Sequence, residues 1–530
     1  MLQLCRYRSN EKNSVQSNFD FTPNLRTNNK FFIMNARLIK RSILVLLLTL
    51  IFWFLYPALR VCFFLITDPI PEDRTFTLSE LAINDASGLN ETKHGGIIKL
   101  NKDLNQTINI LTNSLARSKA ENKKIIPIGA RHSMGKQSIM QNAIHIDLSP
   151  LNGMKMENGL LRVQAGARWK DVLQFLAPLG LSVEIMQSNS DFSIGGTLSV
   201  NAHGWQPDRP PVASSVQKIT LFTANGEIIS CSREENNELF THAMGGYGLF
   251  GIILEAWIKP VPNEILRSSH QVYHYKDFPK EWNKMKGNPV RLAFGRLSVA
   301  QETFFDQVLL THYVTTGQIS TQAGEYDISF RNSIARAVFR ASLNSNRGKS
   351  FRQWMENFLG GEAGGVHARV NLMLEPVRVF TNNDDQKTDM LVEVFIPQEK
   401  FSDFIQEAKK ILQYHSDNLL NVTVREIKKD TDSALPYAQK DMFGLVMLFT
   451  IEQNKKAEGF LKKQIRALFD ASLNQGGTFY LPYRNYATPS HFTKGYPTLQ
   501  AFLTAKKKWD PMETFYSGFY DYLNNSVRGR

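Results

Sequence analysis

Three glycine-rich segments of the sequence have residue types suited to holding a flat, charged ligand against the backbone. They are residues 129–135 (GARHSMG), 193–204 (SIGGTLSVNAHG) and 245–253 (GGYGLFGII). Glycine lets the backbone approach a ligand closely, and successive N–H groups in such turns form a nest for phosphate oxygens. None of the three is a Walker loop or a G-x-G-x-x-G fingerprint, and each taken singly is equally well explained as an ordinary turn.

Alternating strand and helix patterns surround these segments and would position them. The apolar run 124–128 ends where the first segment begins, and the helix-like run 168–179 ends at Gly180, a typical C-terminal residue of a helix. Residues 95–262 are therefore predicted to form one α+β unit. Its predicted helices are 108–122 and 168–179, and its predicted strands are 124–128, 143–148 and 161–165.

Residues 263–475 have longer strand-like runs and are predicted to form a second α+β domain on a larger sheet. The expected strands are 293–297, 308–313, 370–374, 390–396 and 444–451, and the expected helices are 398–414 and 458–472. Residues 476–530 form an aromatic-rich C-terminal segment.

The N-terminal region contains an apolar run over residues 43–66, which as a helix would be roughly 36 Å long, enough to cross a bilayer core. No small-x-small cleavage site follows, so we expect an uncleaved single-pass transmembrane helix. We expect the tail 1–42 to be disordered. Its basic residues predict a cytoplasmic N-terminus and an extracytoplasmic body after the linker 67–94. Met34 is an alternative start, since a compact basic flank follows it.

The formal net charge of +13 does not indicate a nucleic-acid partner. Residues 1–41 hold eight Lys or Arg against two acidic residues, which is +6, so the rest of the chain carries only +7. No stripe of basic residues interleaved with aromatics occurs in the body. The three cysteines lie far apart, which argues against a metal site or a disulfide framework.

In this order, the three glycine-rich segments resemble the FAD-binding domain (PCMH type) of the vanillyl-alcohol-oxidase family, nearest the sugar-lactone and alditol oxidases. The resemblance covers residues 95–262. It implies that residues 128–135 wrap the FAD pyrophosphate, and that further residues line the cofactor. The residues implied to bind FAD are Ile128, Gly129, Ala130, Arg131, His132, Ser133, Met134, Gly135, Ser188, Ser193, Gly195, Gly196, Thr197, Ser199, His203, Gly204, Gly251 and Ile252.

The resemblance also implies a covalent bond between His132 and the flavin. In covalent members a histidine of a Gly-x-x-His-Ser turn bonds the flavin 8α-methyl carbon, and His132 stands at that position. The chemistry needs a neutral imidazole beside the dimethylbenzene ring. The alternatives are that His132 only hydrogen-bonds the flavin or caps the turn.

The C-terminal segment 476–530 resembles the closing segment of the family, which returns to the flavin. The His-Trp-x-Lys type motif usual in lactone and alditol oxidases is absent, and YLPYRNYAT (480–488) stands in its place. Oxidation of a C–OH group needs loss of the hydroxyl proton, which a fixed cation beside the oxygen would ease. Arg484 is the first candidate for that role and Tyr483 the second; the weaker candidates are Arg425, Tyr437, His491 and His367.

These features predict an FAD-dependent oxidase or dehydrogenase that acts on the CH–OH group of a polyol, sugar lactone or related alcohol. Oxygen, or a quinone or other membrane redox partner, would reoxidise the flavin. The first alternative is an oxidase of a lipid-linked sugar at the membrane surface, similar to the decaprenyl-phosphoryl-ribose oxidases, which bind FAD without a covalent bond. The second is a membrane protein that keeps the flavin fold without turnover.

Overall fold

The computed structural model describes residues 26–71, 81–322, 324, 330–359 and 365–528. Within the first helix, the side chains of 26–37, 39, 48, 50, 51, 53 and 54 lie outside this description. The chain divides into two compact units, residues 1–59 and 60–530. The second unit holds the three glycine-rich segments.

Helix α1 (Arg26–Thr67) contains the apolar run 43–66, with Pro57 inside it. The expectation of a transmembrane helix there is not supported, since no helix among the described residues is both long and apolar enough to cross a membrane. Residues 60–67 of α1 belong to the second unit.

The N-terminal part of the second unit is built on two sheets. A three-stranded parallel sheet has the order β3-β5-β4, and a five-stranded antiparallel sheet has the order β10-β9-β11-β7-β6. Helix α2 begins at the capping residue Asp103, whose carboxylate accepts from the Gln106 N–H. The strands are β3 (Ile97–Lys99), β4 (Ile125–Ile128), β5 (Ile144–Asp147), β6 (Met154–Glu157), β7 (Leu160–Gln164), β9 (Val216–Phe222), β10 (Ile228–Ser232) and β11 (Ile252–Ile258), and the helices are α2 (Leu104–Glu121), α3 (Trp169–Leu176), α4 (Ile194–Ser199) and α5 (Asn237–Ala243).

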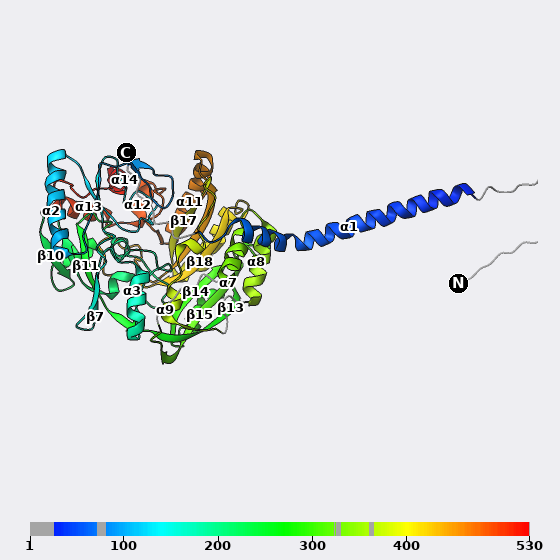
Figure 1. Cartoon of the computed structure of the whole chain (residues 1–530), viewed down its shortest axis with the longest axis horizontal. Coiled ribbons are helices and arrows are strands. Elements are labelled where there is room, and N and C mark those ends of the chain that lie inside the picture. Colours follow the sequence, from blue (N-terminus) through cyan, green and yellow to red (C-terminus); the bar gives the residue numbers. More distant parts are fainter. Residues whose placement is uncertain (1–25, 72–80, 323, 325–329, 360–364, 529–530) are drawn as a thin grey trace, which may run out of the picture. The chain divides into compact units, whose positions relative to one another are not determined.

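An eight-stranded antiparallel sheet forms the remainder, in the order β16-β13-β15-β14-β18-β19-β17-β20. Figure 1 shows its strands side by side in the half of the unit opposite β7, β10 and β11. The strands are β13 (Glu264–His274), β14 (Val290–Leu297), β15 (Gln307–Ile319), β16 (Val366–Ala368), β17 (Lys387–Pro397), β18 (Leu419–Ile427), β19 (Met442–Glu452) and β20 (Thr478–Phe479). The helices of this part are α6 (Phe278–Met285), α7 (Phe330–Ala341), α8 (Asn346–Leu359), α9 (Arg369–Met373), α10 (Phe401–Leu412) and α11 (Lys455–Asn474).

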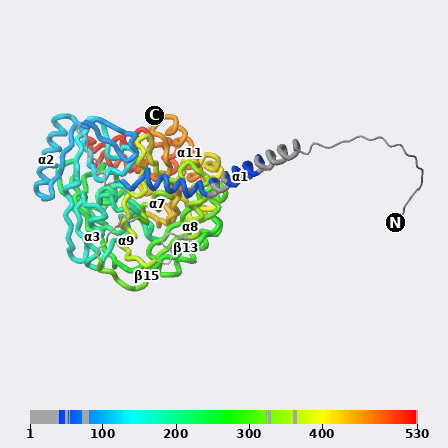
Figure 2. Tube along the Cα trace, turned by 45° about the vertical axis from the view of Figure 1, so that its right-hand side comes forward, coloured from blue at the N-terminus to red at the C-terminus, as the bar shows by residue number. Residues whose placement is uncertain are grey.

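Two short strand pairs complete the sheets, β1 (Ala82–Ile83) with β2 (Thr92–Lys93) and β8 (Leu181–Val183) with β12 (Pro260–Pro262). The C-terminal helices α12 (Pro489–Gly495), α13 (Leu499–Trp509) and α14 (Gly518–Arg528) follow the large sheet. The chain then returns to the N-terminal part, because the Ile125 N–H donates to the Thr514 carbonyl over 2.8 Å. Figure 2 shows the same chain path as a tube, with α2 and α3 at one side and α8 and β13 at the other.

The expected mixture of helices and strands is confirmed, with one wrong element. Residues 370–374 were predicted as a strand but lie in the short helix α9 and its end. The apolar letters VNLML fit either state. Here the Val370 N–H donates to the Asn263 side chain (3.0 Å), and the Val370 and Met373 side chains are fully buried, so tertiary contacts decide.

Candidate active site

The first two glycine-rich segments contact each other through the Ser193 hydroxyl. Ser193 caps α4, and its Oγ accepts from the backbone N–H of Ala130 (3.2 Å) and of Gly196 (3.3 Å). Gly129 lies against the same hydroxyl, where a β-carbon would stand 2.2 Å from the oxygen. The turn after strand β4 therefore contacts the N-terminus of α4 directly. At position 129 only glycine fits without displacing the Ser193 hydroxyl.

The close contact at Gly129 makes a testable prediction. We expect Gly129→Ala to lower the free energy of unfolding by about 2 kcal/mol, because the new methyl group must displace the capping hydroxyl. The same displacement should weaken FAD retention during gel filtration. Thermal unfolding and the absorbance ratio of flavin to protein measure both effects.

Gly459→Ala is the matched control for that variant, since Gly459 lies in α11 and a β-carbon there meets nothing within 4 Å. It should leave flavin content unchanged and stability equal or slightly higher. If Gly129→Ala and Gly459→Ala had the same stability and the same flavin content, the proposed close contact between Gly129 and the Ser193 hydroxyl would be wrong.

The third glycine-rich segment joins the second by backbone hydrogen bonds. Gly245 N–H donates to the Leu198 carbonyl (2.9 Å) and Tyr247 N–H to the Ser199 carbonyl (2.8 Å). Gly248 has a φ of +72° and packs against Pro127 of β4. All three segments, which together span residues 129–253, thus meet at the end of β4 and around α4.

His132 lies in the first turn with its ring stacked on Phe192, at 4.3 Å between centroids. Removal of the ring from water, with Arg168 and Arg131 nearby, lowers the pKa of His132 to about 4, against a weaker opposing effect of the Asp191 backbone. At neutral pH the imidazole is therefore uncharged and keeps a nitrogen lone pair. This protonation state is the one that bond formation to a flavin methyl group requires.

Other groups around the turn also suit a bound cofactor. The Ser138 hydroxyl is buried and has no hydrogen-bond partner among the described residues, which a ligand oxygen would satisfy. Arg131 adopts φ +57°, so the backbone of the turn curls as in anion-binding nests. Thr197 differs, because its hydroxyl is already bonded to Trp169 and Gln187 in the core.

The C-terminal segment 480–486 packs onto the same turn. Met134 N–H donates to the Pro482 carbonyl (2.8 Å), and the Asn485 side-chain amide donates to the Gly135 carbonyl (2.9 Å). A β-carbon at Gly135 would stand 2.3 Å from the Tyr483 carbonyl oxygen. The segment expected to return to the ligand site therefore does contact the first glycine-rich turn.

The two residues first predicted as catalytic point to different partners. Arg484 forms an ion pair with Glu458, and its other nitrogen lies 3.4 Å from the Met134 carbonyl. Tyr483 hydrogen-bonds Glu393, and burial together with this carboxylate raises the pKa of Tyr483 well above its usual value. Tyr483 is thus a phenol at neutral pH, whereas the charge of Arg484 is balanced by Glu458. The catalytic assignment of Arg484 stays a prediction.

Glu393 of β17 is a buried carboxylate that the sequence analysis did not single out. Its Oε1 lies 2.5 Å from Nε2 of His203, whose Nδ1 faces the Gly204 carbonyl at 3.1 Å. The contact between imidazole and carboxylate holds the two buried side chains in a defined orientation.

Arg425 of β18 supplies a buried cation to this cluster. Its Nη2 donates to the Ser188 hydroxyl over 2.5 Å, while its Nε has no partner among the described residues. Burial lowers the pKa of Arg425, with Glu393 and Tyr483 acting in the opposite direction. Arginine remains cationic under such shifts, so the cluster combines a fixed positive charge with a buried carboxylate.

Two tyrosines enclose His203 on the side of the glycine-rich segments. The Tyr437 hydroxyl donates to the Asn201 carbonyl (2.8 Å) and the Tyr480 hydroxyl to the Val200 carbonyl (3.1 Å). The large sheet and the C-terminal segment thus close over residues 200–204. The remaining weak candidates lie elsewhere: His491 bonds Asp470 and Thr488 at the start of α12, and His367 lies in strand β16.

No group of three or more His, Cys, Asp or Glu residues within the described ranges is arranged to hold a metal ion. The cluster at the site is instead one carboxylate, one histidine, one arginine and tyrosines. Such a set can move protons and stabilise an anionic oxygen.

Comparison with known proteins finds similarity in the part of the chain that contains the first two glycine-rich segments. Residues 106–232 match the family described as FAD binding domain. D-arabinono-1,4-lactone oxidase of Yarrowia lipolytica is 29% identical over 177 residues, which is 32% of this chain and 34% of that protein. Cytokinin dehydrogenase 2 of Arabidopsis thaliana is 32% identical over 145 residues, 26% of this chain and 29% of that protein. The chain matches about a third of the length of these curated relatives.

Proposed function

We propose that the protein is an FAD-dependent oxidoreductase acting on a CH–OH group, because residues 106–232 match an FAD binding domain and part of the chain is similar to a D-arabinono-1,4-lactone oxidase. The substrate class we propose is a sugar lactone, a polyol or a related alcohol. The observation that carries the proposal is the cluster of Glu393, Arg425, His203 and Tyr483, held by the large sheet and the C-terminal segment against the three converging glycine-rich segments.

Each residue of the cluster has a distinct task in this proposal. FAD, when bound, accepts a hydride from the alcohol carbon. Glu393 accepts the hydroxyl proton, since His203 on its other side keeps the carboxylate hydrogen-bonded and oriented. Arg425 stabilises the negative charge that develops on the substrate oxygen. Tyr483 donates a hydrogen bond to Glu393 and limits how that carboxylate turns.

An anaerobic spectrum of the flavin-loaded protein tests the proposal. We expect loss of the flavin absorbance near its long-wavelength maximum when the right aldonolactone or polyol is added. The panel should include D-arabinono-1,4-lactone, because a relative of that name matches the cofactor part. A flavin that no alcohol reduces, in a protein that dithionite does reduce, would argue for the alternative of a flavin fold without turnover.

We also propose that His132 bonds the flavin covalently. The neutral ring is supported by the pKa of about 4, so attachment should proceed at a constant rate from neutral pH downwards and slow only as the pH approaches 4. His132→Ala should release all flavin into the supernatant on acid precipitation, while wild-type protein keeps it in the pellet. Flavin in the supernatant of wild-type protein would remove the covalent bond and leave FAD binding intact.

Oxygen, or a quinone or other redox partner at a membrane, is the electron acceptor we propose. The basic residues before the apolar run 43–66 support a membrane location with an extracytoplasmic body. Exposed apolar side chains on α1, among them Leu55 and Leu59, favour oxidation of a lipid-linked sugar as the second candidate function. Reduction of the flavin by a polyprenyl-linked sugar, and by no soluble polyol, would select it.

A further inference from the structure

The helical hairpin α7–α8 is fixed to the large sheet by buried basic side chains. Arg336 donates to the Val379 carbonyl (2.9 Å), Lys349 to the Ser416 carbonyl (2.5 Å) and Arg352 to the Leu420 carbonyl (2.6 Å). These three side chains are buried. The inner face of the hairpin therefore holds charged groups in a defined position, the reverse of the usual arrangement of a surface helix.

The outer face of α8 carries an aromatic ridge, which we define as Phe351, Trp354 and Phe358. The spacing of three and four residues puts all three side chains on one side of the helix. Trp354 and Phe358 are 58% and 73% exposed, and their rings stack at 5.7 Å between centroids. Two neighbouring exposed aromatic rings, with the half-buried Phe351 beside them, mark a surface that another phase or molecule covers.

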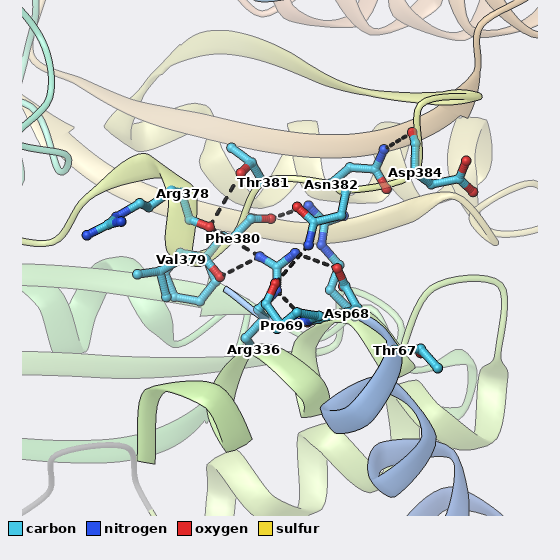
Figure 3. Close-up of polar contacts among 12 residues, drawn as sticks. Thr67, Asp68, Pro69, Arg336, Arg378, Val379, Phe380, Thr381, Asn382 and Asp384 are labelled. Carbon is cyan, nitrogen blue, oxygen red and sulfur yellow. Dashed lines mark hydrogen bonds and ion pairs between the residues drawn. The ribbon is translucent and has the colours of Figure 1, made fainter. Parts of the chain in front are cut away.

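The last turns of α1 lie on the same hairpin. Arg60 donates to the carbonyls of Ala341 and Leu343, both over 2.7 Å, at the end of α7. Figure 3 shows the second attachment, where the Arg336 guanidinium pairs with the Asp68 carboxylate at 2.7 Å, just past the end of α1. Phe63, between the two attachments, is exposed. Residues 60–67 of α1 are therefore held on this hairpin.

The charge of the hairpin indicates which kind of molecule or surface covers the aromatic ridge. Residues 330–359 contain six Lys or Arg and one Glu, a net charge of +5. Part of this charge is neutralised by partners outside the hairpin, since Arg336 pairs with Asp68 and Arg340 with Asp389. With these two carboxylates counted, a net charge of +3 remains, and the buried Lys349 ammonium bonds an uncharged carbonyl. Tryptophan side chains are enriched where a protein meets the headgroup region of a bilayer, and basic residues are attracted to anionic lipids. Both features occur on this hairpin, beside an apolar segment of the chain.

We propose that the aromatic ridge of α8 and the exposed face of residues 60–67 insert together into the surface of an anionic lipid bilayer. This contact would hold the body close to the membrane independently of whether α1 spans it. It is separate from the proposed catalytic cluster, so its failure would leave the proposed oxidation of an alcohol untouched.

Tryptophan quenching by lipid tests the insertion in the full chain. The protein would be mixed with vesicles of phosphatidylcholine and phosphatidylglycerol in which the phosphatidylcholine chains are brominated. We expect Trp354→Phe to lose part of the bromine quenching seen with wild-type protein, because Trp354 would sit among the chains. Trp257→Phe is the matched control: Trp257 is half-buried in β11 between Arg162 and Lys218, and its removal should not reduce the quenching.

A second variant keeps Trp354 as the reporter. Phe358→Asp places a carboxylate in the ridge, so it should lower the quenching of Trp354 without changing the thermal melt, since Phe358 is largely exposed. Tyr414→Asp is the control, at a residue 81% exposed just beyond α10. Unchanged quenching in both Trp354→Phe and Phe358→Asp would overturn the proposal. Shielding of Trp354 that grows with protein concentration in the absence of vesicles would overturn it too, in favour of a second copy of the chain.

Discussion

Glu393→Gln should lower the turnover number by about 10²- to 10⁴-fold, the range expected when a positioned proton acceptor is removed. Glutamine keeps the shape of the side chain and can still bond His203, but its amide cannot take the hydroxyl proton of the substrate. KM should change little, because glutamine has nearly the same size and shape as glutamate and leaves the other contacts of the substrate unchanged. The rate of flavin reduction in an anaerobic stopped-flow experiment measures the effect directly.

The controls for this variant separate chemistry from folding. Glu452→Gln changes an exposed glutamate at the end of the neighbouring strand β19 and should leave the reduction rate unchanged. Flavin content and thermal midpoint of Glu393→Gln should stay near the wild-type values, since the amide preserves the buried hydrogen bonds. A reduction rate within a factor of two of wild type would exclude Glu393 as the proton acceptor.

An FAD-binding region could be recognised from the sequence because each of its glycine-rich motifs is short and local. Where the backbone must lie against a hydroxyl, as Gly129 does beside Ser193, a glycine is required at a fixed position of a short motif, and that glycine can be recognised in the sequence. The neighbouring strand β4 and helix α3 also follow from short apolar patterns, with Gly180 in the left-handed conformation at the end of the turn after α3.

The residues of the proposed catalytic cluster could not be predicted together from the sequence, because they come from separate strands. Glu393 stands inside the apolar run MLVEVFI of β17, and Arg425 in the run NVTVREI of β18, two strands that are not neighbours in the sheet. A lone carboxylate in the middle of a buried strand was the available signal for Glu393, since burial of a charge without partners is costly. Its partners His203 and Tyr483 come from the first part of the chain and from its end, which no local pattern links.

Arg484 and Tyr483 show how an irregular segment can direct neighbouring side chains to different partners. The place of Arg484 in the YLPYRNYAT segment, beside Tyr483, favoured it as the cation of the site. In the structure the neighbouring Tyr483 bonds Glu393, while the guanidinium of Arg484 meets Glu458 of α11. Adjacent residues on an irregular segment thus face different partners, which a sequence pattern does not encode.

Arg425→Met should lower kcat/KM by about 10²- to 10³-fold, the loss typical of removing one preorganised group that stabilises an anionic oxygen. Methionine fills a similar volume without the charge, so the cavity left in the large sheet is small. Arg425→Lys should recover part of the loss, since it restores the charge but not the geometry that reaches Ser188. Steady-state rates on the substrate found in the anaerobic screen, with flavin content held equal, measure these differences.

Arg484→Met provides the decisive comparison for that prediction. The variant removes an ion pair with Glu458, so we expect a lower thermal midpoint with a reduction rate close to wild type in the cold. Arg425 bonds Ser188 and lies near Glu393 and Tyr483 of the proposed catalytic cluster, whereas Arg484 pairs with the carboxylate of Glu458, which neutralises it. An inactive Arg484→Met beside a fully active Arg425→Met would reverse this assignment and place the substrate oxygen on the α11 side of the C-terminal segment.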